Sequence, residues 1–180
     1  MGTQSPFTKV QLFTGMIYDA SMSTSDLFNI VEAPFKASID SFSDTFDFNH
    51  SSYYTAEMGF PLKRLFVSFD RLVSPESAYQ YKEISNRIES QFMTHNKRHV
   101  NIDPGILSLH NILLFSTKNF SHRIACGQGI YTELTLLYQK GCFKSLDWTY
   151  PDFKHSKIQH YFLSLRKRYH TKLQSGDTSS

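Results

Sequence analysis

The chain has 180 residues, 40% of them hydrophobic and 19% charged, and its formal net charge is +3. This length favours one domain with a core that needs no disulfides, and the composition excludes an intrinsically disordered chain. Cys126 and Cys142 form no C-x-x-C pair, the N-terminus lacks a signal-peptide pattern, and no apolar run approaches the ~18 residues of a membrane span. We therefore expect a cytoplasmic protein without a membrane segment.

The chain begins with a predicted strand and a predicted helix. Residues 10–18 (VQLFTGMIY) are apolar on both alternating faces, which indicates a buried strand. Residues 23–35 then predict a helix with Ser23 or Thr24 as the N-cap and a stop at Pro34.

Two strands and a second helix follow. One strand lies within residues 37–48, where the spacing of the aromatic residues leaves the register open, and residues 62–69 (LKRLFVSF) form the next. Residues 74–92 predict a helix with Ser74 as N-cap and Pro75 at the first helical position. Its apolar stripe consists of Tyr81, Ile84, Ile88 and Phe92.

A further strand covers residues 99–103 and ends at Pro104-Gly105. The order β-α-β-β-α-β predicts an α+β fold with a ferredoxin-like core. Residues 106–118 (ILSLHNILLFSTK) are compatible with helix or strand, and their apolar spacing favours helix. Residues 130–138 and 142–146 predict a β-hairpin.

The C-terminal part predicts a helix after Pro151, with Ile158, Phe162, Leu165, Tyr169 and Leu173 on one side. Residues 154–173 contain six Lys or Arg and no acidic residue. This basic segment is compatible with a packed helix that has a solvated end, or with an RNA or acidic-partner surface. We expect one domain over residues 1–174 and a disordered tail over residues 175–180.

The absence of known sequence motifs excludes several kinds of site. The chain has no P-loop, no G-x-S-x-G elbow, no H-E-x-x-H and no EF-hand loop. What remains is a set of polar residues on elements that otherwise look buried. Lys82, Asn86 and Glu89 share one helix face, and Asn101 and Asp103 project from the same side of a strand.

A second group of polar residues lies between residues 115 and 141, and Arg64 shares a strand face with Phe66. Unpaired burial of such groups costs several kcal/mol, so each needs a partner. Two interpretations stay open: an internal salt-bridge network, or a pocket whose cations hold an anion while carboxylates act as base, metal ligand or orienting group. The cations of that pocket would be Arg64, Lys118, His122 and Arg123, and its carboxylates Asp103 and Glu133.

Several segments, read in order, resemble the bacterial and archaeal family called domain of unknown function 4416. They are FNHSSYYTAEMG, LKRLFVSFDRL, KEISNRIE, RHVNIDPGIL, STKNFSHRI, GIYTELTLLYQKG and WTYPDF. The resemblance implies a small cytosolic α/β protein of unassigned biochemistry. The positions that it marks are Tyr54, Glu57, Arg64, Lys82, Asn86, Glu89, Arg98, Asn101, Asp103, Lys118, His122, Arg123, Tyr131, Glu133, Tyr138, Trp148 and Asp152.

These observations predict a pocket for a phosphorylated or carboxylated small molecule, including a nucleotide, with or without enzymatic turnover. The candidate catalytic residues are Asp103, His122 and Glu133. The candidate ligand-binding residues are Arg64, Lys82, Asn101, Lys118, Arg123 and Tyr131. One alternative is an RNA-associated module that uses the basic helix, and another is a metal-dependent hydrolase-like site formed by Asp103, His122 and Glu133. The sequence identifies no cofactor.

Overall fold

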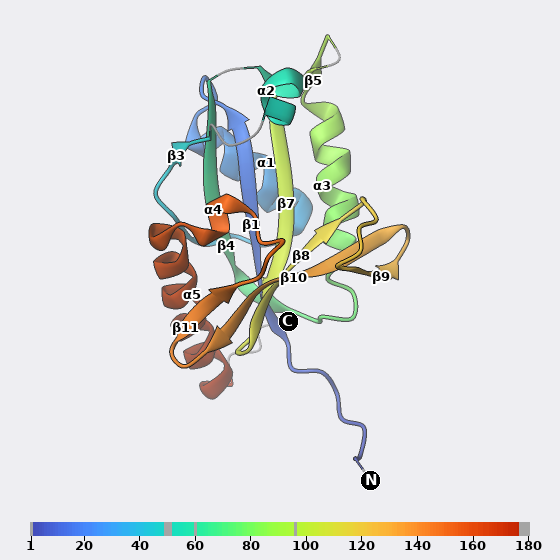
Figure 1. Cartoon of the computed structure of the whole chain (residues 1–180), viewed down its shortest axis with the longest axis vertical. Coiled ribbons are helices and arrows are strands. Elements are labelled where there is room, and N and C mark those ends of the chain that lie inside the picture. The colour runs from blue at the N-terminus through green and yellow to red at the C-terminus, as the bar shows by residue number, and fades with distance from the viewer. Residues whose placement is uncertain (1, 49–51, 60, 96, 177–180) are drawn as a thin grey trace.

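The computed structural model describes residues 2–48, 52–59, 61–95 and 97–176. These residues form a mixed α+β fold with five helices and a mostly antiparallel sheet (Figure 1). The helices are α1 (Thr24–Phe35), α2 (Ser52–Met58), α3 (Gln80–Gln91), α4 (Pro151–Lys154) and α5 (Ser156–Gln174). The strands are β1 (Val10–Asp19), β2 (Ile39–Phe42), β3 (Phe46–Asp47), β4 (Leu62–Val73), β5 (Met93–Thr94), β6 (Lys97–Arg98), β7 (Val100–Leu107), β8 (Asn111–Ser116), β9 (Arg123–Gly127), β10 (Ile130–Gln139) and β11 (Cys142–Ser145).

The main sheet has the strand order β11-β10-β8-β7-β1-β4-β2, and β3 and β9 add to it beside β4 and β10. Strands β1 and β4, predicted as strands of one sheet, pair antiparallel with each other over most of their length. The predicted hairpin is confirmed as β10 and β11. The predicted N-cap of α1 is Ser23, whose side chain accepts from the backbone N–H of Asp26, and α1 ends one residue after Pro34.

Helices cover both faces of the sheet (Figure 1). On one face, α1 and α3 contribute Leu27, Val31 and Ile88 to a core cluster with alternate residues of β1, β4 and β7. On the other face, α5 buries the predicted stripe that includes Phe162 and Leu165 against Phe13, Phe66 and neighbouring side chains. The central strands are therefore buried on both sides, which explains their continuous apolar sequence.

The feature that positions the site is a fork between β7 and β8. The two strands pair only from Gly105↔Leu114 to Leu107↔Ile112, at the C-terminal end of β7. Beyond Gly105, β8 stays paired with β10 as far as Ser116, and both run away from the upper part of β7 (Figure 1). The edge of β7 from residue 100 to 104 therefore has no neighbouring strand on the side of β8.

Two sequence predictions in this region are wrong. Residues 106–118, for which the spacing favoured a helix, form the end of β7, a turn and β8. A short strand that is buried on both faces shows no alternation, so its apolar run resembles that of a helix. The strand predicted to end at residue 103 continues through Pro104 to Leu107. Proline is tolerated there because its missing N–H lies on the unpaired side of β7.

The start of the second helix also differs from the prediction. Helix α3 begins at Gln80, and Ser74 and Pro75 belong to preceding turns held by bonds such as Gln80 N–H to Ser77 O. The Ser74 hydroxyl donates to Glu76 rather than capping a helix. Helix α2 had no counterpart among the predicted elements.

The structure does not test the predicted disordered tail over residues 175–180. The predicted tail begins after α5, and its residues 177–180 lie outside the described part of the chain. Within that part, no helix combines the length and the apolar character that a membrane crossing requires.

We expect a side chain at Gly105, at the base of the fork, to lower the stability for steric reasons. A Cβ at this position would lie 2.5 Å from Leu113 O and 2.5 Å from Phe13 Cζ. Gly105→Ala should therefore push β8 or Phe13 away and destabilise the protein by about 1–3 kcal/mol or more. Urea denaturation of this variant and of the control Gly2→Ala, where the added Cβ meets nothing within 4 Å, measures the effect. Equal stability of both variants would contradict the tight approach at the fork.

Candidate functional site

A cavity of about 610 Å³ occupies the fork, and we call it the fork cavity. Its walls come from the open edge of β7, the outer ends of β8, β9 and β10, and helices α2, α3 and α4. A cavity of this size is typical of small-molecule sites, which usually measure about 300–1,000 Å³. Segments that are far apart in the sequence thus meet around one space.

The open edge of β7 is capped by side chains of α3. The N–H of Ile102 donates to Glu89 Oε1 at 2.8 Å, and the carbonyl oxygen of Ile102 accepts from Lys82 Nζ at 2.8 Å. Buried backbone groups need partners, and no strand supplies them here. The predicted polar face of this helix therefore replaces the missing strand. Lys82 Nζ and Glu89 Oε1 also form an ion pair at 3.6 Å.

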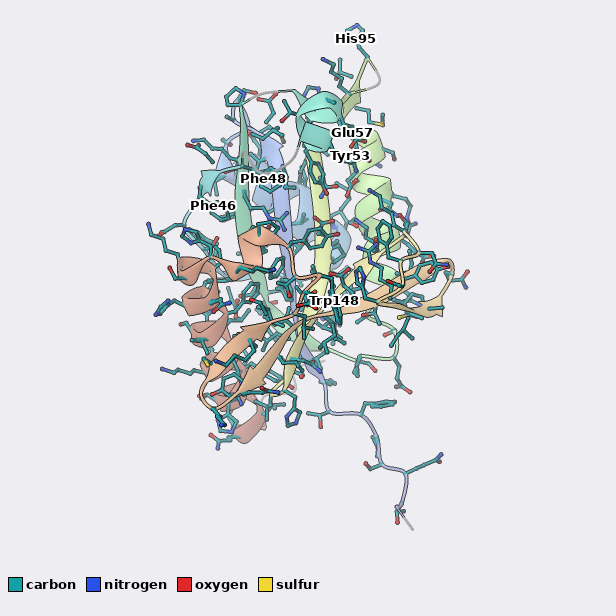
Figure 2. The ribbon with its side chains drawn as sticks, viewed as in Figure 1. Phe46, Phe48, Tyr53, Glu57, His95 and Trp148 are labelled. Atoms are coloured by element: carbon teal, nitrogen blue, oxygen red, sulfur yellow. The ribbon has the colours of Figure 1, made fainter. Side chains whose placement is uncertain are left out.

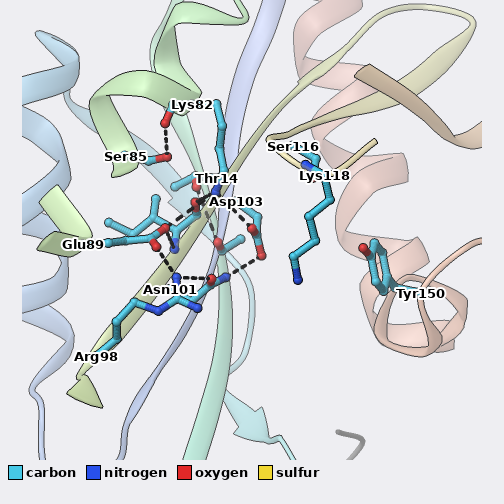
Figure 3. Close-up of polar contacts among 12 residues, drawn as sticks. Thr14, Lys82, Ser85, Glu89, Arg98, Asn101, Asp103, Ser116, Lys118 and Tyr150 are labelled. Carbon is cyan, nitrogen blue, oxygen red and sulfur yellow. Dashed lines mark hydrogen bonds and ion pairs between the residues drawn. The ribbon is translucent and has the colours of Figure 1, made fainter. Parts of the chain in front are cut away.

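Asp103 lies next to this cap and receives donors from three residues, of which Figure 3 shows Asn101 and Lys82. Its Oδ2 accepts from Asn101 Nδ2 at 2.7 Å and from Arg64 Nη1 at 3.4 Å, and its Oδ1 accepts from Lys82 Nζ at 3.4 Å. Burial alone would raise the pKa of this carboxyl, but Lys82 and Arg64 outweigh it and hold the pKa below its usual value. The side chain keeps 25% exposure, so the cavity meets an ionised carboxylate.

Arg64 reaches Asp103 by crossing β1. It starts on β4, lies with its guanidinium carbon 4.6 Å from the ring centroid of Phe66, and passes over Gly15. A Cβ on Gly15 would lie only 2.7 Å from Arg64 Nη2. The Nε atom of Arg64 is 3.0 Å from Asp152 Oδ2 of α4, a charge contact without hydrogen-bond geometry. Glycine at position 15 thus provides the space for the guanidinium.

Arg98 connects α2 and α3 at another wall of the cavity. Its Nη2 donates to Glu57 Oε2 at 2.7 Å, and its Nη1 donates to Glu89 and, at 3.1 Å, to Asn101 Oδ1. Glu57 and Tyr53 are both carried by α2, as Figure 2 shows. Burial raises the pKa of Glu89, although Lys82, the Ile102 N–H and Arg98 oppose this rise. These contacts hold α2 against the open edge of the sheet.

Arg123 and Glu133 form a buried ion pair across β9 and β10. Arg123 Nε donates to Glu133 Oε2 at 2.8 Å, and the two side chains are 2% and 1% exposed. The guanidinium also donates to Ser116 Oγ, to Lys118 O and to the Tyr150 hydroxyl, all within 2.9 Å. Arg123 is therefore committed to protein groups and fixes the segment that carries Lys118.

Lys118 differs from the other cations of the cavity. Its Nζ lies 4.5 Å from the centroid of the Tyr53 ring, and no described carboxylate pairs with it. In Figure 3 its side chain extends into the space between Asp103 and Tyr150. The Tyr54 hydroxyl and the Asn86 amide also line the cavity without a hydrogen-bond partner among the described residues. Burial raises the pKa of Tyr54, so its phenol stays neutral.

Most residues predicted from the sequence as site residues meet at this cavity. The lining contains Arg64, Lys82, Asn101, Asp103, Lys118, Arg123 and Glu133. His122 and Tyr131 are not part of the lining. His122 stacks between Phe120 and Trp148, with its Nε2 3.3 Å from Glu133 Oε2.

The three candidate metal ligands do not form one cluster, although His122 and Glu133 are neighbours. In the described ranges no set of three or more His, Cys, Asp or Glu side chains is arranged to hold a metal ion. Glu133 is bonded to Arg123, whereas Asp103 is bonded to Asn101 and to the cations Lys82 and Arg64.

Comparison with protein-family models identifies residues 8–169 as a domain of unknown function (DUF4416). The chain belongs to the DUF4416 family. No curated protein and no solved structure matches it. The positions that the resemblance marked in this DUF4416 chain line the fork cavity, except His122, Tyr131, Tyr138 and Trp148. The motifs of the sequence and the cavity of the structure therefore coincide.

Sequence reasoning missed the aromatic part of this DUF4416 site. Phe48, Tyr53, Phe115 and Tyr150 line the cavity beside the charged residues. Tyr53 and Tyr150 lie inside quoted motifs, one and two residues from marked positions, and that neighbourhood was the available signal. An aromatic residue in a chain with sixteen Phe and ten Tyr is otherwise indistinguishable from a core residue.

The buried ion pair predicts a large loss of stability when its cation is removed. Arg123→Ala leaves Glu133 buried without a counter-charge, which should destabilise the protein by about 3–5 kcal/mol. The double variant Arg123→Ala/Glu133→Gln removes that stranded charge and should recover part of the loss. Chemical denaturation of both single variants and the double variant gives the coupling energy. Additive losses would argue against the pair as the main role of Arg123.

We expect the contribution of Asp103 to the stability of the fold to depend on pH. Its folded pKa lies below the unfolded value of 3.8, so its stabilising effect is complete above that value and disappears as the pH falls through the folded pKa. Asp103→Asn should lower the free energy of unfolding by about 1.5–3 kcal/mol at neutral pH. This difference should shrink below about pH 4.

Denaturant melts between pH 2 and pH 7 measure this difference. Asp44→Asn, which changes an exposed carboxylate, is the control and should show little effect. A loss in Asp103→Asn that stays constant over the whole range would mean that packing of the amide, not the carboxylate charge, is responsible.

Proposed function

We propose that this DUF4416 chain binds a small anionic molecule, phosphorylated or carboxylated, in the fork cavity. The observation that carries the proposal is that Lys118 has no carboxylate partner among the described residues. The other cations of the lining, Arg64, Lys82, Arg98 and Arg123, each pair with a carboxylate. Lys118 has no such partner among the described residues, so its ammonium supports a site for an anion from outside.

The surroundings of Lys118 support a ligand that also has an apolar or aromatic part. The Tyr53 ring beneath the ammonium, the Tyr54 phenol and the Asn86 amide combine apolar surface with unused hydrogen-bonding groups. Cavities that bind small molecules typically have this mixture of aromatic walls and few polar anchors. A nucleotide is one molecule with both parts.

Binding is better supported than acid–base catalysis. A general base works best when its pKa is near the operating pH, and the pKa of Asp103 is lowered instead. Glu133 is engaged by Arg123, and His122 stands outside the cavity lining. If turnover occurs, we propose Asp103 as the group that orients a ligand hydroxyl or amine.

The RNA alternative has weaker support. Three basic residues of α5 are engaged by protein groups: Arg166 donates to Leu109 O, Arg168 to Ser41 Oγ, and Lys172 pairs with Asp40 at 2.8 Å. Their charges are partly used in holding the helix to the sheet. The metal alternative likewise lacks a ligand cluster among the described residues.

We also propose that the central part of the fold is a ferredoxin-like unit to which further strands were added. The neighbour order β7-β1-β4-β2 supports this, because these correspond to the fourth, first, third and second strands of the predicted β-α-β-β-α-β pattern. Helices α1 and α3 connect β1 to β2 and β4 to β7 and pack on one face. Strands β8 to β11 then extend the sheet beyond β7.

Lys118→Ala tests the proposed function directly. The exposed ammonium contributes about 0.5–1 kcal/mol through the Tyr53 ring, so the variant should melt close to the parent temperature. Phosphate that binds only the folded protein should stabilise the parent by about 2.7 kcal/mol at a concentration of a hundred times Kd. The melting temperature of the parent should therefore rise. Lys118→Ala should lose this increase.

Thermal melts in phosphate and in chloride of equal ionic strength make the measurement. Lys157→Ala, which removes an exposed lysine of α5, is the matched control and should respond to phosphate as the parent does. The proposal fails if phosphate and small carboxylates stabilise neither the parent nor the control, or if Lys118→Ala still responds fully.

A further inference from the structure

A second cavity adjoins the fork cavity between α3 and the turn that joins β9 and β10. It has a volume of about 540 Å³ and is more open. Asn86 and Thr117 line both cavities, so the two spaces meet at these side chains. We call the second space the side cavity.

An uncommitted cation lies on each side of this junction. Lys118 follows Thr117 in the chain and lines the fork cavity, and Arg87 follows Asn86 and lines the side cavity. Arg87 is exposed, and no described carboxylate lies within ion-pair distance of it. The junction therefore lies between two positive charges that the protein itself leaves unmatched.

The junction and the side cavity also offer hydrogen-bond donors. The Asn86 amide and the Thr117 hydroxyl have no hydrogen-bond partner among the described residues. The turn residues Gln128 and Gly129 line the side cavity with left-handed backbones (φ 52° and 73°), and no described group accepts from their N–H groups. Such donors favour negatively charged oxygen atoms.

In the side cavity, one carboxylate of the lining opposes this arrangement. Glu83 lies one helical turn before Arg87 and also lines the side cavity. Its spacing from Arg87 suits an ion pair on a helix, yet the two side chains form none in the structure. Glu83 thus lowers the positive potential at Arg87 without occupying its guanidinium.

We propose that the ligand carries two linked anionic groups, one at Lys118 in the fork cavity and the other at Arg87 in the side cavity. This inference rests on the proposed function and adds the class of ligand to it. The linker crosses the junction, where Asn86 and Thr117 donate hydrogen bonds to the adjoining oxygen atoms of the anionic groups. Two linked phosphates and two linked carboxylates share this chemistry.

Titration calorimetry with the full chain tests the proposal, using orthophosphate, pyrophosphate and tripolyphosphate as probes. A charge-assisted hydrogen bond to the second anion should make the condensed phosphates bind about tenfold tighter than orthophosphate, or more. Arg87→Ala should lose that gain and keep the orthophosphate affinity of the parent. Arg71→Ala, which removes an arginine of β4 outside both cavities, is the matched control and should keep the gain.

Two further arms identify the anion and the role of the opposing carboxylate. The series acetate, succinate and glutarate makes the same comparison for carboxylates. The series in which the two-anion probes bind tighter than the one-anion probe identifies the anionic groups of the ligand as phosphates or carboxylates. Glu83→Gln should tighten binding of the two-anion probes by several-fold and leave the one-anion probes unchanged.

The outcomes separate the two proposals. Orthophosphate or acetate binding that depends on Lys118, without any gain for the linked anions, overturns this inference and leaves the proposed function standing. A gain that persists in Arg87→Ala also overturns it. Absence of binding by every probe overturns the proposed function and this inference together.

Discussion

The fork in the sheet is the constraint on which the site depends. Strand β8 follows β7 for three residue pairs from Gly105 and then leaves it, so backbone groups of β7 that a neighbouring strand would bind must find other partners. Lys82 and Glu89 supply them at Ile102, and the carboxylate and ammonium used for this purpose bring further charges with them. The cavity is the space that the departing strand leaves open.

The charges around this space mainly stabilise each other. Breaking a buried ion pair by removing one partner is expensive, whereas keeping it gives little net stability. The network of Asp103, Lys82 and Arg64 is therefore best understood as a rigid wall with a fixed charge distribution. A wall of this kind presents polar groups without rearrangement when a ligand arrives, which lowers the free-energy cost of binding. Lys118 is positioned by the neighbouring Arg123–Glu133 pair, since its carbonyl oxygen accepts from Arg123, and its ammonium is not neutralised by that pair.

Hydrophobic periodicity predicted β1, β4, the terminal hairpin and α5, because each has a clear apolar pattern. The shared helix face of Lys82 and Glu89 was predictable for the same reason, since spacings of three and four place side chains together. The pairing of Arg123 with Glu133 was one of several open alternatives, because the choice among partners is made by strand register rather than by sequence distance. Residues 106–118 were misread since a doubly buried strand and a helix share the same apolar run. The fork itself has no local sequence signal, because it is a relation between two strands.

Gly15 has a consequence for how related chains should vary. It contributes no atom to the cavity lining, yet its missing side chain is the space in which the Arg64 guanidinium lies. Positions 15 and 64 are thus one steric unit: a larger residue at the first is compatible only with a shorter residue at the second. In an alignment of family members the two columns should covary, and a member with alanine or serine at the first position should have lost the cation that reaches Asp103. Such a chain would keep the sheet and the fork but line its cavity with a different charge, and under the proposed function it would select a different ligand.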